Sequence, residues 1–313
     1  MPVLGYVLIL LSSAFFCIQN VVVRILFAEH PLIGIGVTGG FLTPTLQNSF
    51  LLLLLRMVLA VPLMGLFSLR LYPKIWQDLG HLRQPLQRRA LFHALAGGGL
   101  MFAYLALLYV SIGLIPTGIA LTLFFTFPVF TALFSWRFFD HRPTMTRWGI
   151  MAAILLGSAL TIPQEQWTGG GSYWGALFGV AAGVTYALYT VNAQKSFDYL
   201  HPVPYTWVSF AITLGLSAAC LLIWPRSAMP SLAWGAIWFW SLVSGFVTFA
   251  GHVLYNSGIR QIGATSAAMI GAANPALTVV LAWLAIQEVL QGVQVLGVGI
   301  VTLSVASLSR TGK

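Results

Sequence analysis

Three ionisable side chains lie inside long apolar stretches, and their chemistry gives the first indication of function. Arg56 follows five consecutive leucines, and His93 and His252 have similarly apolar neighbours. An intramembrane arginine is a candidate binding group for a carboxylate, and histidine is the side chain that titrates near neutrality. The alternatives are structural. Arg56 extends to an interface or caps the carbonyls of a broken helix, and each histidine is a hydrogen-bonded core residue.

Tyrosines and amides in the same apolar stretches form a second set of candidates. Polar side chains inside a bilayer usually point into the helix bundle, so this set is expected to line a substrate cavity. Tyr186 and Tyr189 share one helix face. For each tyrosine, packing plus one interhelical hydrogen bond is the alternative. The set comprises Tyr104, Tyr186, Tyr189, Asn192, His252, Tyr255 and Asn256.

Two prolines lie at matched positions inside apolar segments. Pro128 lies in LTLFFTFPVFTALFSW (residues 121–136), and Pro275 lies in GAANPALTVVLAW (271–283). A proline removes one backbone donor and clashes with the carbonyl four residues earlier. In hydrocarbon such an interruption is tolerated only where it faces protein or a wet cavity, so the pair predicts two broken helices beside a substrate site. A kink that only aids packing is the alternative for either proline.

The residues around the two prolines differ in size and polarity. Phe124 belongs to a bulky aromatic run, whereas Gly271 and Asn274 lie in the small-residue segment aligned with it. These residues predict a cavity with one aromatic wall and one small wall, in which the Asn274 amide is available to a polar group. Such a cavity suits a modest substrate with an apolar portion.

The elements that position these residues are expected to be membrane-spanning helices. The chain is 58% hydrophobic and only 7% charged, whereas a soluble domain carries roughly 25% charged residues. This composition predicts an all-α polytopic membrane protein with ten transmembrane helices. The link at 28–45 is rich in Gly, Pro and Thr, and it is predicted to form an ordered loop or a short re-entrant piece. The predicted spans are residues 3–27, 47–69, 90–111, 116–136, 145–162, 172–194, 203–224, 232–258, 263–286 and 291–309.

The formal net charge of +9 is explained by membrane topology and not by nucleic acid. If the N-terminus is cytoplasmic, Arg24 and Arg226 are the basic residues of the opposite side and Arg56 lies within a span. Every other Lys and Arg then falls on the cytoplasmic side. Because short cytoplasmic loops carry an excess of Lys and Arg, we expect a multi-pass protein of the cell (inner) membrane with both termini in the cytoplasm.

An internal repeat divides the chain into two halves, residues 1–164 and 165–313. Each half contains five predicted spans, and an odd number inserts the second half upside down relative to the first. Inverted repeats are a recurrent construction of secondary transporters, with the substrate site near the midplane. The matched pairs are Pro128 and Pro275, Thr131 and Thr278, Trp136 and Trp283, and Asp140 and Glu288.

This ordered set of features resembles the drug/metabolite transporter superfamily, and within it the EamA-like branch of amino-acid and metabolite exporters. The resemblance covers nearly the whole chain and depends on the ten-span plan, the matched prolines and the acidic residues after them. It implies a central cavity lined mainly by spans 3, 4, 8 and 9, with spans 1 and 6 contributing. It also implies alternating access of a small-molecule substrate.

We therefore expect a secondary carrier that exports amino acids or similar small metabolites. A nucleotide-sugar, phosphorylated-metabolite or drug exchanger is the alternative within transport, but phosphate would need several midplane cations and Arg56 is the only one. A membrane scaffold is the alternative from another class. An enzyme is not expected, because the chain has no paired intramembrane carboxylates and no histidine cluster with metal spacing.

No cofactor or metal is expected, and the partners are a small-molecule substrate and the lipid bilayer, without nucleic acid. Gly175, Gly179 and Gly183 recur at four-residue intervals, a spacing that lets helices approach closely. We expect this stripe to pack within a monomer, with a dimer as the alternative. No Asp or Glu lies near a span centre, so proton coupling through His93 or His252 and facilitated diffusion both stay open.

Overall fold

The structure is a predominantly helical bundle. The computed structural model describes residues 2–32, 36–82, 84, 87–115, 117–140, 142–161, 173–223, 233–286 and 291–311. Its elements are α1 (Pro2–Phe27), β1 (Glu29–Leu32), β2 (Gly36–Gly39), α2 (Leu46–Leu71), α3 (Ile75–His81), α4 (Arg88–Leu114), α5 (Thr117–Phe124), α6 (Phe127–Phe139), α7 (Met145–Leu160), α8 (Tyr173–Ser196), α9 (Pro202–Ile223), α10 (Trp234–Gly271), α11 (Asn274–Ile286) and α12 (Gly292–Thr311).

Within the described residues, seven helical segments are long and apolar enough to cross a membrane. They are α1, α2, α4, α8, α9, α10 and the combined segment Ile119–Phe139, which joins α5 to α6. The shorter helices α7, α11 and α12 are also apolar. The chain is therefore a multi-pass helical membrane protein.

The link after α1, predicted as an ordered loop or a short re-entrant piece, contains two short strands, whereas the fold was predicted as all-α. Strands β1 and β2 pair antiparallel, with Glu29 opposite Gly39 and Leu32 opposite Gly36. Gly39 has a φ of 122°, and an added Cβ would lie 2.6 Å from the carbonyl oxygen of Ile25. The hairpin therefore lies against the end of α1. A second element that the sequence did not predict is the short helix α3.

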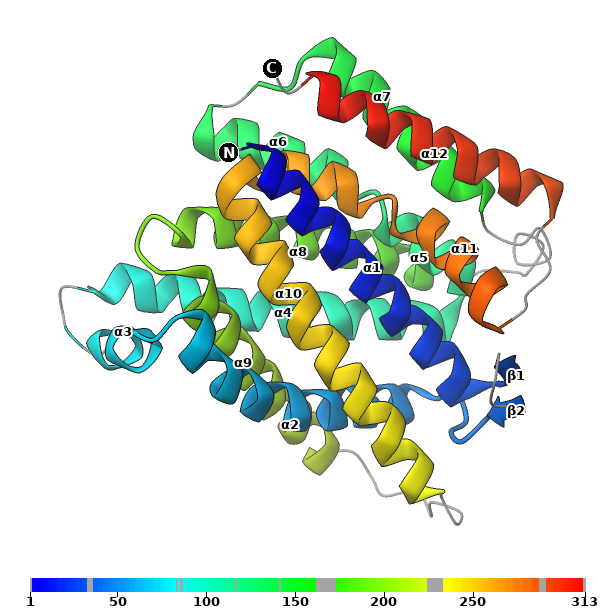
Figure 1. Ribbon diagram of the computed structural model, residues 1–313, viewed down its shortest axis with the longest axis horizontal. Helices are drawn as coiled ribbons and strands as arrows, with labels where there is room; N and C mark the ends of the chain where they lie inside the picture. Colours follow the sequence, from blue (N-terminus) through cyan, green and yellow to red (C-terminus); the bar gives the residue numbers. More distant parts are fainter. Residues whose placement is uncertain are drawn as a thin grey trace.

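The bundle is built from long helix pairs that cross at close range (Figure 1). Helix α1 packs along α10, α4 packs along α8, α2 packs against α9, and α7 packs against α12. In Figure 1 the α7–α12 pair lies along one edge of the molecule. Small residues allow these approaches. An added Cβ at Gly258 of α10, for example, would lie 2.6 Å from Cγ1 of Ile9 of α1.

The two predicted helix interruptions are present. Helix α5 ends at Phe124, and α6 begins at Phe127 with Pro128 in its first turn, where a proline costs no hydrogen bond. Helix α10 ends at Gly271 and α11 begins at Asn274.

At both interruptions, side-chain hydroxyls donate to backbone carbonyls beside the break, where hydrocarbon offers no other partner. Thr126 Oγ1 donates to the carbonyl of Leu123 at 2.6 Å. Ser158 Oγ of α7 donates to the carbonyl of Ala272 at 3.0 Å. The interruptions are therefore integrated into the packing of the bundle.

Helix α10 contains a further break at Gly263, between two segments that the sequence predicts as separate spans. The φ of 79° and ψ of 162° at Gly263 lie outside the helical region and favour glycine. Gln194 Oε1 of α8 accepts a hydrogen bond from the backbone N–H of Ala264 at 2.6 Å. Gln194 thus caps the helical segment that leads into the second interruption.

Replacing Gln194 by leucine is expected to lower the stability of the fold by about 1–3 kcal/mol, because the backbone N–H of the buried Ala264 loses its acceptor. Thermal melting of the purified protein in detergent measures the effect. Gln194→Glu is the matched control, since it keeps an oxygen acceptor at the same reach. Equal melting temperatures for Gln194→Leu and wild type would contradict the capping role.

Candidate functional site

A cavity of about 840 Å³ opens between the helices of the bundle. It extends from His252 and Tyr104, which are buried, to Ala28, Pro44 and Gln291, which are exposed. The exposed end lies beside the β1–β2 hairpin. The cavity is therefore a deep chamber whose mouth is at one end of the bundle.

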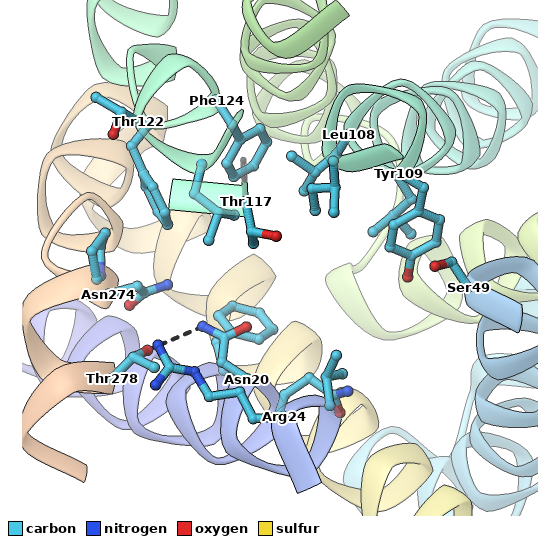
Figure 2. Close-up of a pocket in the computed structure, with 18 of the residues that line it drawn as sticks. Asn20, Arg24, Ser49, Leu108, Tyr109, Thr117, Thr122, Phe124, Asn274 and Thr278 are labelled. Carbon is cyan, nitrogen blue, oxygen red and sulfur yellow. Dashed lines mark hydrogen bonds between the residues drawn. The ribbon is translucent and has the colours of Figure 1, made fainter. Parts of the chain in front are cut away.

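Two walls face each other across this chamber (Figure 2). Asn20 and Arg24 of α1 and Asn274 and Thr278 of α11 lie on one side. Across the open space lie Leu108 and Tyr109 of α4, and Thr117, Thr122 and Phe124 of α5.

A polar network forms part of the chamber around Arg56, which is only 8% exposed. Arg56 Nε donates to Ser244 Oγ of α10 at 3.0 Å. Because a guanidinium has only donors, the Gln19 amide presents its oxygen to Arg56, and Arg56 Nη2 donates to Gln19 Oε1 at 2.8 Å. In this orientation Gln19 Nε2 donates to Thr248 Oγ1 at 3.2 Å. The network joins α1, α2 and α10.

Helix α11 is held to α1 at the second interruption. Asn20 Nδ2 donates to Thr278 Oγ1 at 3.1 Å, and Cys17 Sγ contacts the carbonyl oxygen of Asn274 at 3.5 Å. Asn274 Oδ1 is buried and has no hydrogen-bond partner among the described residues. The broken segment is therefore anchored through α1 and carries one unsatisfied polar atom beside the cavity.

Aromatic rings line the inner part of the chamber. Tyr186 of α8 is central, with its ring centroid 4.9 Å from that of Tyr104 and 4.6 Å from that of Phe127. Phe124 contacts the same cluster, 5.4 Å from Tyr186. These aromatic pairs supply a large apolar surface with fixed geometry.

The end of the bundle opposite the mouth is closed by hydrogen bonds among α4, α8 and α9. His93 Nδ1 lies 2.7 Å from Asn192 Oδ1, and Asn192 Nδ2 donates to the carbonyl of His93 at 2.8 Å. Asn192 Nδ2 also lies 3.2 Å from Tyr205 Oη. The Tyr205 ring packs on Gly97, where an added Cβ would lie 2.6 Å from Tyr205 Cζ.

A second buried group lies between this closed end and the chamber. Asn256 Nδ2 of α10 donates to Tyr189 Oη at 3.2 Å and to Thr206 Oγ1 at 2.8 Å. Asn256, Tyr189 and Thr206 have no exposed surface. These bonds join α8, α9 and α10 beneath the aromatic cluster.

A small cluster outside the spans completes the closed end. The rings of Tyr72 and His201 stack at 4.1 Å, and Tyr72 Oη donates to Asp78 Oδ2 at 2.7 Å. This hydrogen bond raises the pKa of Tyr72. Burial and the nearby Arg260 lower the pKa of His201, so its imidazole is neutral at pH 7 and its Nδ1 accepts from the Val203 N–H at 3.3 Å.

The structure brings part of the predicted site together at the chamber and places the rest around it. Pro128 and Gly271 lie at the two interruptions, and Tyr255 packs on Tyr186. Tyr189 and Asn256 belong to the buried network behind the chamber, and Asn192 and His93 belong to the partly buried network at the closed end. The predicted residues that line the chamber are Arg56, Tyr104, Phe124, Tyr186, His252, Asn274 and Pro275.

Sequence reasoning did not single out Gln19, Asn20 or Thr278, although all three line the chamber. Gln19 and Asn20 form a polar pair inside the first apolar span, and an intramembrane amide is a default site candidate. That signal was available in the sequence. Thr278 carried a weaker one, because it repeats Thr131 of the first half.

Comparison with known proteins gives several related chains. The sequence model of the EamA-like transporter family matches residues 173–310. An uncharacterized transporter of Synechocystis sp. is 53% identical over 311 residues, which cover 98% of this chain and 93% of that protein.

More distant relatives carry a more specific description. Threonine/homoserine exporter RhtA of Salmonella typhimurium is 28% identical over 212 residues, covering 66% of this chain and 65% of that protein. RhtA of Escherichia coli K12 is 27% identical over 215 residues, covering 67% and 66%. A solved crystal structure superposes with a TM-score of 0.75 at 18% identity and covers 99% of this chain and 96% of its own. At this identity the superposition shows the fold alone.

Proposed function

Because this chain belongs to the EamA-like transporter family, we propose that it is a secondary transporter that exports amino acids or similar small metabolites through the central chamber. The observation that carries the proposal is the chamber itself, about 840 Å³ in volume and bordered by both helix interruptions. Two RhtA relatives described as threonine/homoserine exporters support the amino-acid class.

The proposal includes ten membrane spans arranged as two inverted five-span repeats, residues 1–164 and 165–313. The packing supports it, because each helix and its counterpart in the other half make corresponding contacts. In the proposed repeat, α1 corresponds to α8, α4 to α10, and α6 to α11. The contact of α1 with α10 corresponds to that of α8 with α4, and the contact of α1 with α11 corresponds to that of α8 with α6. The α2–α9 and α7–α12 contacts map onto themselves. Such internal symmetry provides two related conformations for alternating access.

In this proposal the chamber is open to the outside and closed to the cytoplasm. The distribution of Lys and Arg supports this orientation, since the mouth lies at the end that is poor in basic residues. Export then requires a second state in which the bonds among His93, Asn192 and Tyr205 are broken and the inner end opens. The protein would lie in the cell (inner) membrane with both termini cytoplasmic.

Proton-coupled transport and facilitated diffusion are both compatible with the chamber. His252 lines it, and its Nδ1 lies 3.0 Å from the carbonyl oxygen of Thr248. Because a carbonyl only accepts, Nδ1 carries a proton, and proton uptake would occur at Nε2. An imposed pH gradient should accelerate transport in wild type and not in His252→Gln if this residue carries the proton. Equal rates with and without the gradient support facilitated diffusion.

Counterflow in proteoliposomes tests the transport function. Liposomes containing the purified protein are loaded with one unlabelled compound and supplied with a trace of the labelled compound outside. We expect transient accumulation of label for at least one amino acid in a panel that includes threonine and homoserine. Protein-free liposomes give the leak rate. Leak-level uptake for every compound in the panel would contradict the proposed function and favour the scaffold alternative.

A further inference from the structure

Arg56 is a buried cation whose hydrogen-bonding capacity is only partly used. A guanidinium has five N–H donors. Nε donates to Ser244 Oγ at 3.0 Å and Nη2 donates to Gln19 Oε1 at 2.8 Å. The remaining N–H groups have no hydrogen-bond partner among the described residues, and the side chain lines the chamber. These donors are available to a molecule in the chamber.

The partners of Arg56 hold its guanidinium in place but do not neutralise its charge. Ser244 and Gln19 are both neutral acceptors on helices other than α2. No Asp or Glu of the described chain lines the chamber, whereas Arg24 and Arg56 both do. A cation inside the bilayer is costly unless it is paired. The surroundings of Arg56 therefore favour a ligand that brings its own negative charge.

The chemistry of the chamber changes toward its inner wall. Tyr104, Phe124, Phe127 and Tyr186 present aromatic rings there, with centroid separations from 4.6 to 6.1 Å. Aromatic faces suit an apolar group, and they also attract an ammonium. A ligand that contacts both Arg56 and these aromatic rings has an anionic end and a compact apolar or cationic portion.

We propose that Arg56 binds the carboxylate of the transported compound. The substrate class is then α-amino acids and related small carboxylic acids, and the chamber discriminates against the corresponding amides and decarboxylated amines. Gln19 and Ser244 are positioning residues, because they orient the guanidinium without neutralising it. This inference rests on the proposed function, since it specifies the substrate of the same chamber.

The test compares chemically matched compounds in the counterflow assay. Each set contains an acid, its amide and its decarboxylated amine. Threonine is matched with threoninamide and 1-amino-2-propanol, and leucine with leucinamide and 3-methylbutylamine. Because hydrogen bonds to a charged group are stronger than those between neutral groups, we expect wild type to exchange the acid at least about tenfold better than its amide or amine.

Substitutions at Arg56 test the same idea from the side of the protein. Arg56→Gln should reduce exchange of the acid by about tenfold or more and leave exchange of the amide near its wild-type value, so that the preference disappears. Arg56→Lys should retain part of the preference for the acid. Arg70→Gln is the matched control, because Arg70 lies on the same helix but is exposed in its last turn. It should behave as wild type.

The outcomes separate this inference from the proposed function. If the amides or amines exchange as well as the acids in wild type, the carboxylate assignment is overturned, but the proposed transport function is still supported. If Arg56→Gln keeps the acid preference, Arg56 is not the binding group. If no compound of any set exchanges, the proposed function fails and this inference fails with it. The wild-type comparison needs no variant, so it decides the substrate class even where a substituted protein does not fold.

Discussion

Replacement of Gly97 by leucine should abolish transport. An added Cβ at this position would lie 2.6 Å from Cζ of Tyr205, which is closer than packed atoms approach. Tyr205 would have to move away from Asn192, and α4 would separate from α9 at the closed end. Overpacking of this kind costs about 1–3 kcal/mol. Counterflow is expected to fall to the leak rate, and thermal melting should show a loss of stability.

Gly99 provides the control on the same helix. An added Cβ at Gly99 meets no atom within 4 Å, so Gly99→Leu should transport and melt like wild type. A second test is rescue. Combining Gly97→Leu with Tyr205→Ala removes the clash and should restore part of the stability. If Gly97→Leu alone retains wild-type exchange, close contact of α4 with α9 is not required for the transport cycle.

Replacement of Gly297 by leucine should cause the largest loss of stability among the substitutions considered. Gly297 of α12 packs on Gly157 of α7, and an added Cβ would lie 2.6 Å from the carbonyl oxygen of Gly157. A backbone atom cannot rotate out of the way as a side chain can. The two helices must therefore separate, at a cost on the order of 3 kcal/mol. Thermal melting in detergent measures the change.

Gly299 is the matched control for this pair, because its added Cβ meets no atom within 4 Å. Gly299→Leu should melt at the wild-type temperature. An unchanged melting temperature for Gly297→Leu would mean that α7 and α12 do not depend on this contact. Since Ser158 of α7 donates to the carbonyl of Ala272, a shift of α7 should also disturb the second interruption and lower transport.

The positions of the helices could be predicted because membrane spans leave a strong sequence signal. Each predicted span coincides with a helix or with segments of two helices, and the predicted interruptions at Pro128 and Pro275 are present. The hairpin β1–β2 could not be predicted in the same way. Its strands have four residues each, too short for alternation to distinguish a strand from an ordered loop.

For the candidate site, the sequence indicated which side chains point into the bundle better than it indicated where each of them lies. Polarity in an apolar stretch indicates that a side chain points inward, but it does not say whether that side chain meets a cavity or another buried group. Tyr104 lines the chamber, whereas Tyr189 bonds to Asn256 behind it. That difference depends on the crossing of α8 with α10, which is a property of the tertiary packing. Gln194 was missed for the same reason, because its role appears only beside Gly263.

The unneutralised charge of Arg56 has an electrical consequence. The membrane potential acts on any charge that changes depth in the bilayer, with an energy of about 2.3 kcal/mol per elementary charge for each 100 mV. When the empty carrier reorients, Arg56 is exposed to part of this field as a net cation. A bound α-amino acid is a zwitterion and adds no net charge, so the loaded carrier keeps the charge of Arg56, whereas a simple carboxylic acid bound as its anion cancels that charge. With an amino acid, voltage would then act equally on the loaded and the empty step, and with a simple carboxylic acid only on the return of the empty carrier, whose charge movement would be visible as a transient current.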